Sequence, residues 1–386
     1  MEERTRAYLR GRFGDHYRRS DVTPPPDAHA REWGYVPWTE GPGETYIRHK
    51  SLLDLGDLGD FLARERPRHV YFSAGRYEDP SASTMGGKTW QSSDLIFDLD
   101  ADHLPRAEPD DSYAEMLEKC KDALVRLLDF LTDDFAFEDL TVVFSGGRGY
   151  HVHVRDECIQ HLERDARREI VDYVRGIGLD PDSLIRTEMR GNVTARVLPT
   201  DGGWSRRVHR RLLAFVDDVD GTSESEALDR LQDLDGIGEG RAKTIYGAIQ
   251  RNREAIESGN MEAGGVGIRT LVDSLVGETV AAENAPIDEP VTTDTNRLIR
   301  LPGSIHGGSG LAVQRIDRAD IAAFDPLVDA VPETFRTHDI TVEVTDGGRV
   351  ELDGDSFTLQ EREVTVPEYL GVFLMARGRA EKGQEG

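Results

Sequence analysis

Cysteine, lysine and long apolar runs are all scarce in this sequence of 386 residues. Cys120 and Cys158 are too few for a disulfide framework or a cysteine-rich zinc site, and such sparing use of cysteine is typical of a reducing compartment. No run of about 18 apolar residues occurs, and the first residues lack the apolar stretch of a signal peptide. We therefore expect a cytoplasmic protein without a membrane partner, whose metal chemistry would use oxygen or histidine ligands.

Lysine supplies only six of the 47 basic residues, and the 73 acidic residues give a formal net charge of −26. An acidic excess with scarce lysine indicates adaptation to a salt-rich cytoplasm. At molar salt the Debye length falls to about 3 Å, so this net charge does not exclude a nucleic acid partner. It does require that any phosphate-binding site be a local cluster of arginines.

The order of predicted helices and strands indicates an α/β or α+β core with a helical insertion. Residues 1–160 read as a helix followed by β, α, β, α, β, β, whereas residues 161–275 are helical, charge-rich and interrupted by glycines. Strand patterns return over residues 276–378, with Asp346-Gly347-Gly348 predicted as a hairpin turn and a last helix at about 368–377. Residues 379–386 are predicted to form a disordered tail.

An acidic pair, Asp98 and Asp100, directly follows the apolar strand Leu95-Ile96-Phe97. In a strand the two side chains point the same way, with Cα atoms roughly 6.5 Å apart. This spacing arises often by chance in so acidic a chain, but two like charges beside a buried strand are costly without a cation. Mg²⁺ or Mn²⁺ prefers such oxygen ligands, and Asp288 can supply a third carboxylate. The sequence therefore predicts a metal site.

Two further segments carry side chains suited to a triphosphate. The run from Ser145 to His151, Ser-Gly-Gly-Arg-Gly-Tyr-His, follows a buried strand, and its glycines let backbone N–H groups approach an anion beside Arg148. The alternative is an ordinary glycine turn. In the second segment, Arg297 and Arg300 precede a Pro-Gly turn and His306. The alternatives there are solvated surface cations and a structural histidine.

Residues 186–211 hold seven arginines against two acidic residues, and this cluster includes Arg206 and Arg207. Such a local excess of positive charge could bind the phosphate backbone of a template strand. The alternative is ion pairing with neighbouring acidic helices. Residues 234–245 resemble a helix-hairpin-helix, in which a Gly-Ile-Gly turn offers N–H groups to a DNA phosphate. Against this, several carboxylates lie at the same place, and a plain helical insertion is the alternative.

These motifs, in this order, resemble the catalytic small subunit of archaeal and eukaryotic DNA primase, in a halophilic archaeal form. The similarity covers roughly residues 1–160 and 190–320. It also includes Arg31-Glu32-Trp33-Gly34-Tyr35 and Tyr46-Ile47-Arg48 near the N-terminus. The resemblance implies an α/β catalytic core with an RRM-like mixed sheet, a helical subdomain and a large-subunit partner in a heterodimer.

The same resemblance implies a role for each site residue. Asp98, Asp100 and Asp288 would ligate two Mg²⁺ or Mn²⁺ ions. The incoming nucleoside triphosphate would be held by the remaining motif residues, which are Ser145, Arg148, His151, Arg297, Arg300 and His306. Many relatives carry a zinc knuckle after the acidic pair, but residues 103–120 offer only one histidine and one cysteine. We therefore expect no structural zinc.

The resulting hypothesis is a template-directed nucleotidyltransferase that starts primers on single-stranded DNA during replication. A competing hypothesis is a non-catalytic DNA-binding or repair module that uses the arginine cluster and the hairpin-like segment. A third is a metal-dependent phosphohydrolase, which would use the same carboxylates with water as the nucleophile. Template dependence separates the first hypothesis from the third.

Overall fold

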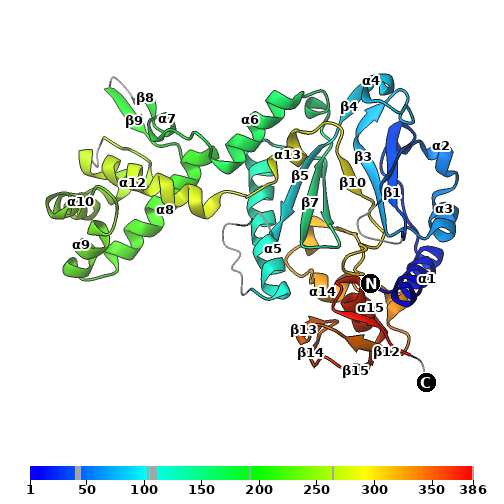
Figure 1. Ribbon diagram of the computed structural model, residues 1–386. Helices are drawn as coiled ribbons and strands as arrows, with labels where there is room; N and C mark the ends of the chain where they lie inside the picture. The colour runs from blue at the N-terminus through cyan, green and yellow to red at the C-terminus, as the bar shows by residue number, and fades with distance from the viewer. Residues whose placement is uncertain (40–44, 102–103, 105–110, 191–192, 263–264, 385–386) are drawn as a thin grey trace. The chain divides into compact units, whose positions relative to one another are not determined.

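The computed structural model describes residues 1–39, 45–101, 104, 111–190, 193–262 and 265–384. Helices and antiparallel sheets alternate along the chain, so the expected α+β class is confirmed. The chain divides into two compact units (Figure 1). Unit 1 comprises residues 1–122, 138–168 and 287–386, and unit 2 comprises residues 123–137 and 169–286.

Two antiparallel sheets form the centre of unit 1. The first has the strand order β10-β3-β1-β2, with β4 also paired to β3, and the second has the order β11-β6-β7-β5. The strands of the first sheet are β1 (Arg31–Val36), β2 (Ile47–Lys50), β3 (His69–Tyr77), β4 (Trp90–Ser93) and β10 (Leu298–Arg300). Those of the second are β5 (Leu95–Asp100), β6 (Leu140–Phe144), β7 (Gly149–Val154) and β11 (Gln314–Ile316).

The two sheets of unit 1 pack against each other through apolar and ionic contacts. Phe72 of β3 stacks on His153 of β7, with ring centroids 6.1 Å apart. Asp94, between β4 and β5, is fully buried and forms ion pairs with the guanidinium groups of three arginines. Its partners are Arg31 at 2.9 Å, Arg76 at 2.7 Å and Arg155 at 3.1 Å. Because these arginines come from or adjoin both sheets, the buried carboxylate fixes one sheet to the other.

Helices surround these sheets, and α1 illustrates why the predicted pattern folds as it does. Leu9, Phe13 and Tyr17 recur every four residues and are all buried, so they lie on one face of the helix. The predicted helix at 52–66 is interrupted at Gly56, which has φ of +80°. The helices wholly in unit 1 are α1 (Glu3–Arg19), α2 (Leu52–Leu55), α3 (Leu58–Glu65), α4 (Met85–Lys88), α13 (Glu289–Thr293), α14 (Pro326–Asp329) and α15 (Glu368–Ala376).

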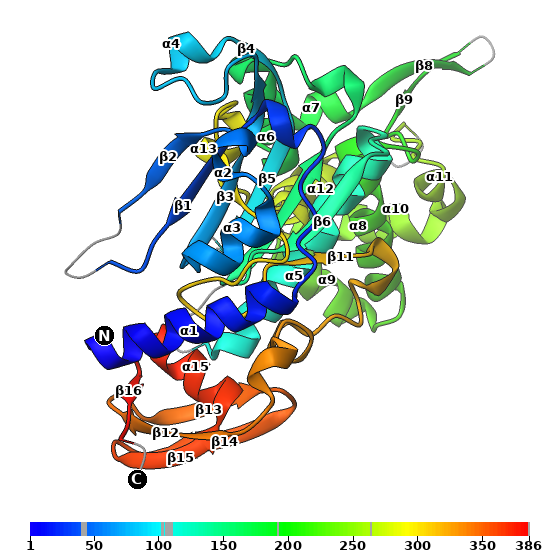
Figure 2. The ribbon, with the colours of Figure 1, turned by 90° about the vertical axis from the view of Figure 1, so that its right-hand side faces the viewer.

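The C-terminal part of unit 1 contains a small sheet, a hairpin and α15, next to α1 (Figure 2). The small sheet has the order β15-β12-β16, and β13 pairs with β14 in the hairpin. The strands are β12 (Asp339–Val344), β13 (Gly348–Leu352), β14 (Asp355–Leu359), β15 (Glu363–Pro367) and β16 (Ala380–Lys382). The N-terminal amine forms an ion pair with Glu381 at 3.1 Å.

Two expectations for this region were wrong. The turn at residues 346–348 does not join paired strands, because β12 pairs with β15 and β16 instead of β13. The tight turn lies at Asp353-Gly354, where both residues have positive φ. The expected disordered tail is ordered through residue 384, since β16 pairs with β12 and the N–H of Lys382 donates to Thr5 Oγ1 at 2.8 Å.

Unit 2 is mainly helical, with α12 packed against α8 and α10. Its elements are η3 (Phe130–Asp134), α7 (Pro181–Leu184), β8 (Arg186–Arg190), β9 (Val193–Val197), α8 (Gly203–Asp220), α9 (Glu224–Gln232), α10 (Glu239–Arg251), α11 (Arg253–Glu257) and α12 (Gly265–Glu283). Two helices, α5 (Tyr113–Asp129) and α6 (Arg164–Arg175), contribute residues to both units.

The boundaries of unit 2 differ from the predicted insertion at 161–275, because unit 2 runs to residue 286 and also takes residues 123–137 from the core. Within the described ranges, no helix combines the length and the apolar character that crossing a bilayer requires.

Candidate active site

Three carboxylates gather where β5 ends. Asp98 and Asp100 are alternate residues of β5 and are partly exposed, whereas the flanking Phe97 and Leu99 are buried. Asp288, which precedes α13, donates its backbone N–H to the carbonyl oxygen of Asp98 at 2.9 Å. The strand alternation predicted from the sequence therefore holds, and a main-chain hydrogen bond brings in a residue from 190 positions away.

The electrostatics of Asp98 reflect this gathering. Burial raises the pKa of Asp98 to about 6, and the neighbouring carboxylates of Asp100 and Asp288 act in the same direction, against Arg300. Within the described residues, no three His, Cys, Asp or Glu side chains by themselves form a group that could hold a metal ion. Mg²⁺ usually completes its shell with water and substrate phosphates, so an open set of hard oxygen donors with mutual repulsion fits such an ion.

The glycine-rich loop between β6 and β7 lies next to this acidic edge. Its ends are joined by the N–H of Ser145, which donates to the carbonyl of Gly149 at 3.0 Å. At Gly149, a Cβ atom would lie 1.7 Å from the carbonyl oxygen of Leu99, so only glycine allows β5 and β7 to approach here. Arg148 is exposed on the loop, with Nε 4.0 Å from Asp100 Oδ1.

The segment carrying His306 packs directly on this loop. Gly146 has φ of +74°, and a Cβ there would lie 2.7 Å from the Cβ of His306. The hydroxyl of Ser309 donates to the carbonyl of Gly146. Two motifs that lie far apart in the sequence therefore form one surface.

Arg297 and Arg300 add positive charge to the same region. Their charges stabilise the ionised form of Asp98, and Arg300 also lowers the pKa values of His151 and His306. Arg300 Nε is buried without a hydrogen-bond partner, and its guanidinium lies 5.8 Å from the centre of the Tyr71 ring. Among the residues that the structure describes, no carboxylate forms an ion pair with either arginine. Both cations are thus available to an anionic ligand.

The site histidines are neutral. His151 lies opposite Asp98 on β7, with Nε2 3.4 Å from Asp98 Oδ1. Burial, assisted by Arg300, lowers the pKa of His151 to about 3, and burial also holds the pKa of His306 well below its usual value. Each imidazole can therefore offer a hydrogen bond near neutral pH, while the positive charge comes from the arginines.

Comparison with known proteins adds a second line of support. The sequence model of the family described as DNA primase small subunit matches residues 97–318, a range that contains every residue of this site. A protein named DNA primase small subunit PriS from Haloarcula marismortui is 68% identical over the whole of both chains. The chain belongs to the DNA primase small subunit family. Relatives with the same name from Halorubrum lacusprofundi and Methanococcoides burtonii are 59% and 38% identical, and cover at least 99% of this chain and 100% of the relative.

In this member of the primase family, the predicted template-binding pair belongs to unit 2. Arg207 is buried, its Nη1 lies 2.6 Å from Asp134 Oδ2, and its guanidinium lies 3.7 Å from the centre of the Phe130 ring. Arg207 is therefore paired inside the fold, and its contact with the template stays a prediction. Arg206 is 28% exposed and pairs with Asp133 at 2.9 Å.

The hairpin-like segment of the primase chain, residues 234–245, comprises the turn that follows α9 and the first part of α10. Gly236 has φ of +79°, and Ile237 is buried beneath the turn. Lys243 is paired with Glu239 at 2.7 Å in the first turns of α10. The helices and the turn are confirmed, and DNA contact by this segment stays a hypothesis.

Several residues that support the primase site were missed by sequence reasoning. Tyr113 of α5 donates its hydroxyl to the carbonyl of Gly147, and the thiol of Cys120 donates to that of Arg148 at 3.2 Å. The ring of His69 lies 4.9 Å from that of His306. A polar residue at the start of an apolar strand was the available signal for His69, whereas nothing local marks Tyr113.

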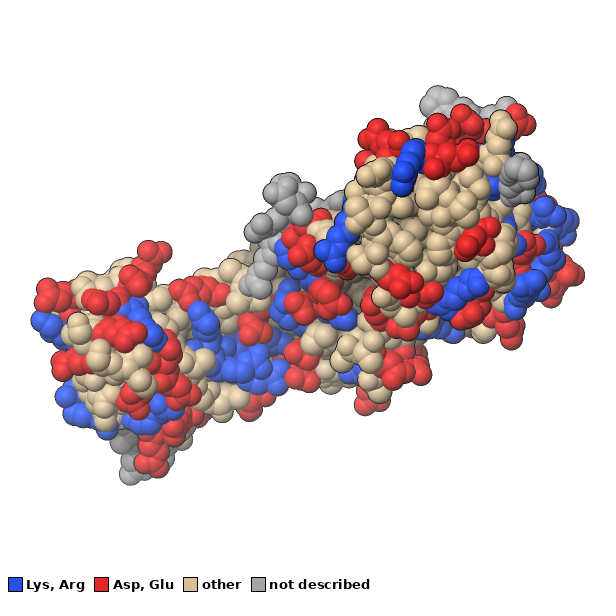
Figure 3. All heavy atoms as spheres, turned by 90° about the horizontal axis from the view of Figure 1, so that it is seen from below, with Lys and Arg blue, Asp and Glu red and all other residues tan. Residues whose placement is uncertain are grey.

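The surface charge of this primase chain is mixed at short range. On the face drawn in Figure 3, acidic and basic side chains of the described residues are interspersed over both units. A phosphate would therefore meet local groups of arginines, as the net charge of −26 requires.

Proposed function

We propose that this chain is the catalytic subunit of a DNA primase, which synthesises short primers on a single-stranded DNA template from nucleoside triphosphates. This proposal rests on one observation: three carboxylates lie close to Arg297 and Arg300, and no carboxylate of the described residues forms an ion pair with either arginine. Clustered acids suit divalent cations and unpaired arginines suit a triphosphate, which is the combination that nucleotidyl transfer requires.

Each site residue has a defined task in this proposal. Asp98, Asp100 and Asp288 would hold two Mg²⁺ or Mn²⁺ ions, which, when bound, supply charge stabilisation for the attacking and leaving oxygens. Arg297 and Arg300 stabilise the negative charge of the triphosphate. Those charges are already in place before the substrate arrives, so little reorganisation accompanies the reaction.

The remaining donors orient the triphosphate. The neutral imidazoles of His151 and His306 contribute hydrogen bonds, and Arg148 adds charge from the exposed side of the loop. Ser145 receives a hydrogen bond from the N–H of Gly147 at 3.3 Å and so holds the loop in shape. A structural zinc is still not expected, although residues 103 and 105–110 of the relevant stretch lie outside the described residues.

We further propose that the chain works in the cytoplasm as a heterodimer with a large subunit. The relatives are named small subunits, which supports a larger partner. The competing DNA-binding hypothesis uses the arginine cluster and the hairpin-like segment, and one arginine of that cluster, Arg207, is buried. A phosphohydrolase would use the same carboxylates, so the test must include template dependence.

The decisive experiment is incorporation of labelled nucleotides on unprimed single-stranded DNA in molar KCl with Mg²⁺ or Mn²⁺. The native chain is compared with D98N/D100N and with a control, E361Q/E363Q, that removes two exposed carboxylates at the same spacing. We expect template-dependent product from the native chain and the control, and none from D98N/D100N. The unfolding midpoint of D98N/D100N should not fall below that of the native chain, because the two substitutions relieve repulsion among the clustered carboxylates.

Three outcomes would contradict the proposal. Product from D98N/D100N would overturn the metal assignment. No product from the native chain, even with a primed template and the large subunit, would favour the DNA-binding hypothesis. Nucleotide consumption that is independent of template would favour a phosphohydrolase.

A further inference from the structure

A basic cavity adjoins the glycine loop in unit 1, on elements that the proposed chemistry does not use. It has a volume of about 320 Å³ and lies between the start of α5, the hairpin β13–β14 and the end of α15. We call it the arginine pocket and define it by five lining residues, which are Tyr113, Arg349, Phe373, Arg377 and Arg379. Three arginines around one cavity are notable in a chain whose net charge is −26.

Arg377 is the central cation of the arginine pocket. Its guanidinium lies 4.3 Å from the centre of the Tyr113 ring and 5.2 Å from that of Phe373. Within the described part of the chain, no carboxylate forms an ion pair with Arg377. Burial and the nearby charges of Arg379 and Arg148 lower its pKa. The two rings hold the guanidinium in place, so it can meet a ligand with little loss of side-chain entropy.

The other two arginines are held at the rim by polar groups. Arg379 lies 3.4 Å from Asp346, and Arg349 lies 2.6 Å from Glu351. Glu115, also at the rim, is occupied in capping its own helix through the N–H of Ser112 at 2.8 Å. Glu115 keeps its negative charge, so the three arginines and the two lining carboxylates, Glu115 and Glu351, leave the lining of the pocket with a formal charge of +1.

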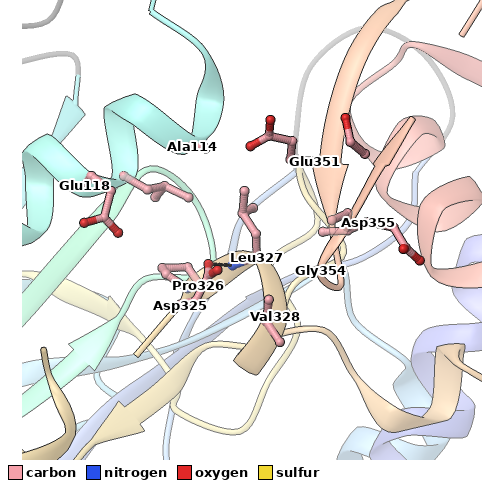
Figure 4. A pocket seen from close by; sticks show the side chains of 12 residues that line it. Ala114, Glu118, Asp325, Pro326, Leu327, Val328, Glu351, Gly354 and Asp355 are labelled. Carbon is pink, nitrogen blue, oxygen red and sulfur yellow. Dashed lines mark hydrogen bonds between the residues drawn. The ribbon is translucent and has the colours of Figure 1, made fainter. Parts of the chain in front are cut away.

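A neighbouring cavity has the opposite character. Figure 4 shows Glu118, Asp325, Glu351 and Asp355 around this cavity. It has a volume of about 420 Å³ and shares Ala114, Leu327 and Glu351 with the arginine pocket. Its lining holds these carboxylates without an arginine or lysine, so it would repel a phosphate. An anion approaching this side of unit 1 is thus directed to Arg377.

The arginine pocket is connected to the proposed nucleotide site by α5. Tyr113, whose ring packs on Arg377, donates its hydroxyl to the carbonyl of Gly147. One residue further along the loop, Arg148 reaches Asp100. Arg377 and Arg148 are close enough for each to influence Tyr113 electrostatically. The pocket is therefore a continuation of the positive surface that begins at the loop.

We infer that the arginine pocket binds a backbone phosphate of the nucleic acid strand on which this enzyme works. The inference rests on the proposed function for the identity of the strand. The guanidinium of Arg377 lies over one face of each of the two rings, and the pocket offers charge and hydrogen bonds to a phosphate. A nucleic acid strand extends beyond the proposed catalytic carboxylates and needs further groups that bind its phosphates. A single nucleoside triphosphate does not need them, because Arg297 and Arg300 already bind its phosphates in the proposed function.

The test measures binding of the full chain to a labelled oligothymidine that has no terminal phosphate, over a series of KCl concentrations. R377Q should weaken binding about five- to tenfold and reduce the slope of log K against log[salt] by about 0.7, the value for one phosphate of a single strand. R377K, which keeps the charge but loses the planar fork, should lie in between. R64Q, which removes an exposed arginine of α3, is the matched control.

Two further variants distinguish phosphate binding by the arginine pocket from loss of folding and from binding of the nucleotide. R349Q alters a rim arginine whose side chain is 71% exposed, so it tests the pocket even if R377Q unfolds. We expect about a twofold loss of DNA affinity from R349Q. R300Q should raise the nucleotide KM, whereas R377Q should leave the nucleotide KM unchanged on saturating template. The unfolding midpoint of each variant is recorded alongside.

The outcomes are distinct. The inference would be overturned if R377Q and R349Q fold and have the same DNA affinity and the same salt slope as R64Q. Weakened binding of free nucleoside triphosphate or inorganic pyrophosphate with unchanged DNA affinity would also overturn it and assign the pocket to free anions. If the native chain makes no primer but R377Q still loses DNA affinity, the pocket stands and only the proposed function fails.

Discussion

Five histidines in the described part of unit 1 have lowered pKa values, and burial is the main cause in each case. They are His16, His69, His151, His153 and His306. In the unfolded chain each would titrate near pH 6.5. Below that pH the unfolded state binds protons that the folded state does not, so acid favours unfolding.

We therefore predict that stability falls as the pH is lowered from about 7.5 to about 5.5, by up to about 1.4 kcal/mol per pH unit for each histidine. Asp98 acts in the opposite direction, because its folded pKa of about 6 lies above its usual value. The folded chain therefore takes up a proton on Asp98 as the pH falls, which offsets the destabilising effect of one histidine. Urea unfolding at several pH values in molar KCl measures the slope. H16Q should reduce the slope by about one proton, and stability that is independent of pH would show that these imidazoles have the same pKa values in the folded and the unfolded chain.

Single residues also show what the sequence could and could not predict. Asp98 and Asp100 could be predicted as a pair because strand alternation is a local property, whereas Asp288 was proposed from its residue type and from the resemblance to the primase family. The burial of Arg207 could not be foreseen, because its partner Asp134 lies 73 residues earlier and meets it only through tertiary packing. The same holds for Tyr113, whose bond to Gly147 depends on where α5 packs.

At the scale of elements, the pairing of β5 with β7 positions the proposed catalytic edge. Gly149 lies opposite Asp100, and an added Cβ would meet the Leu99 carbonyl at 1.7 Å. We predict that G149A loses about 3 kcal/mol or more of stability together with primer synthesis, since a backbone clash cannot be relieved by a side-chain rotation. Urea unfolding and the incorporation assay measure the two effects.

The control for this prediction is G240A in α10, where nothing lies within 4 Å of the added Cβ. Alanine favours a helix over glycine by up to about 1 kcal/mol, so G240A should be neutral or stabilising. Equal behaviour of the two variants would mean that β5 and β7 do not approach as described.

Elements were predicted best where one periodic pattern decides their type. The helices at α1, α5 and α15 and the strands β5 and β6 follow their apolar patterns. The hairpin was misplaced because Asp346-Gly347-Gly348 and Asp353-Gly354 are both good turn sequences, and only strand pairing selects the second. The pairing of β16 with β12 likewise depends on contacts between the two ends of the chain.

At the scale of the whole molecule, the division into units is interleaved along the chain. Unit 2 takes residues 123–137 from the middle of the core sequence, and the carboxylates of the proposed site come from both sides of the helical insertion. Composition predicted that an insertion exists, because charge-rich helical sequence replaces strand patterns. Its limits could not be predicted, because α5 and α6 are continuous helices that belong to both units.

The net charge of −26 makes stability depend on salt, and one row of acidic side chains, of which Glu381 also pairs with the N-terminal amine, contributes to this effect. Glu343 of β12 lies directly between Glu363 of β15 and Glu381 of β16. Like charges at opposed positions of adjacent strands destabilise a sheet by about 0.2–1 kcal/mol. At about 0.1 M salt the Debye length is about 10 Å, whereas at 1 M it is about 3 Å.

We predict that KCl raises the unfolding free energy of the native chain, and that E343Q is more stable than the native chain by about 0.5 kcal/mol at about 0.1 M KCl. The difference should disappear in molar KCl, because screening then removes the repulsion that the substitution relieves. The control is E224Q, which removes a carboxylate from the first turn of α9, where the helix dipole favours negative charge. E224Q should therefore not stabilise the chain at low salt. If E224Q stabilised the chain as much as E343Q does, the effect of E343Q would come from the lower net charge and not from the row of opposed carboxylates.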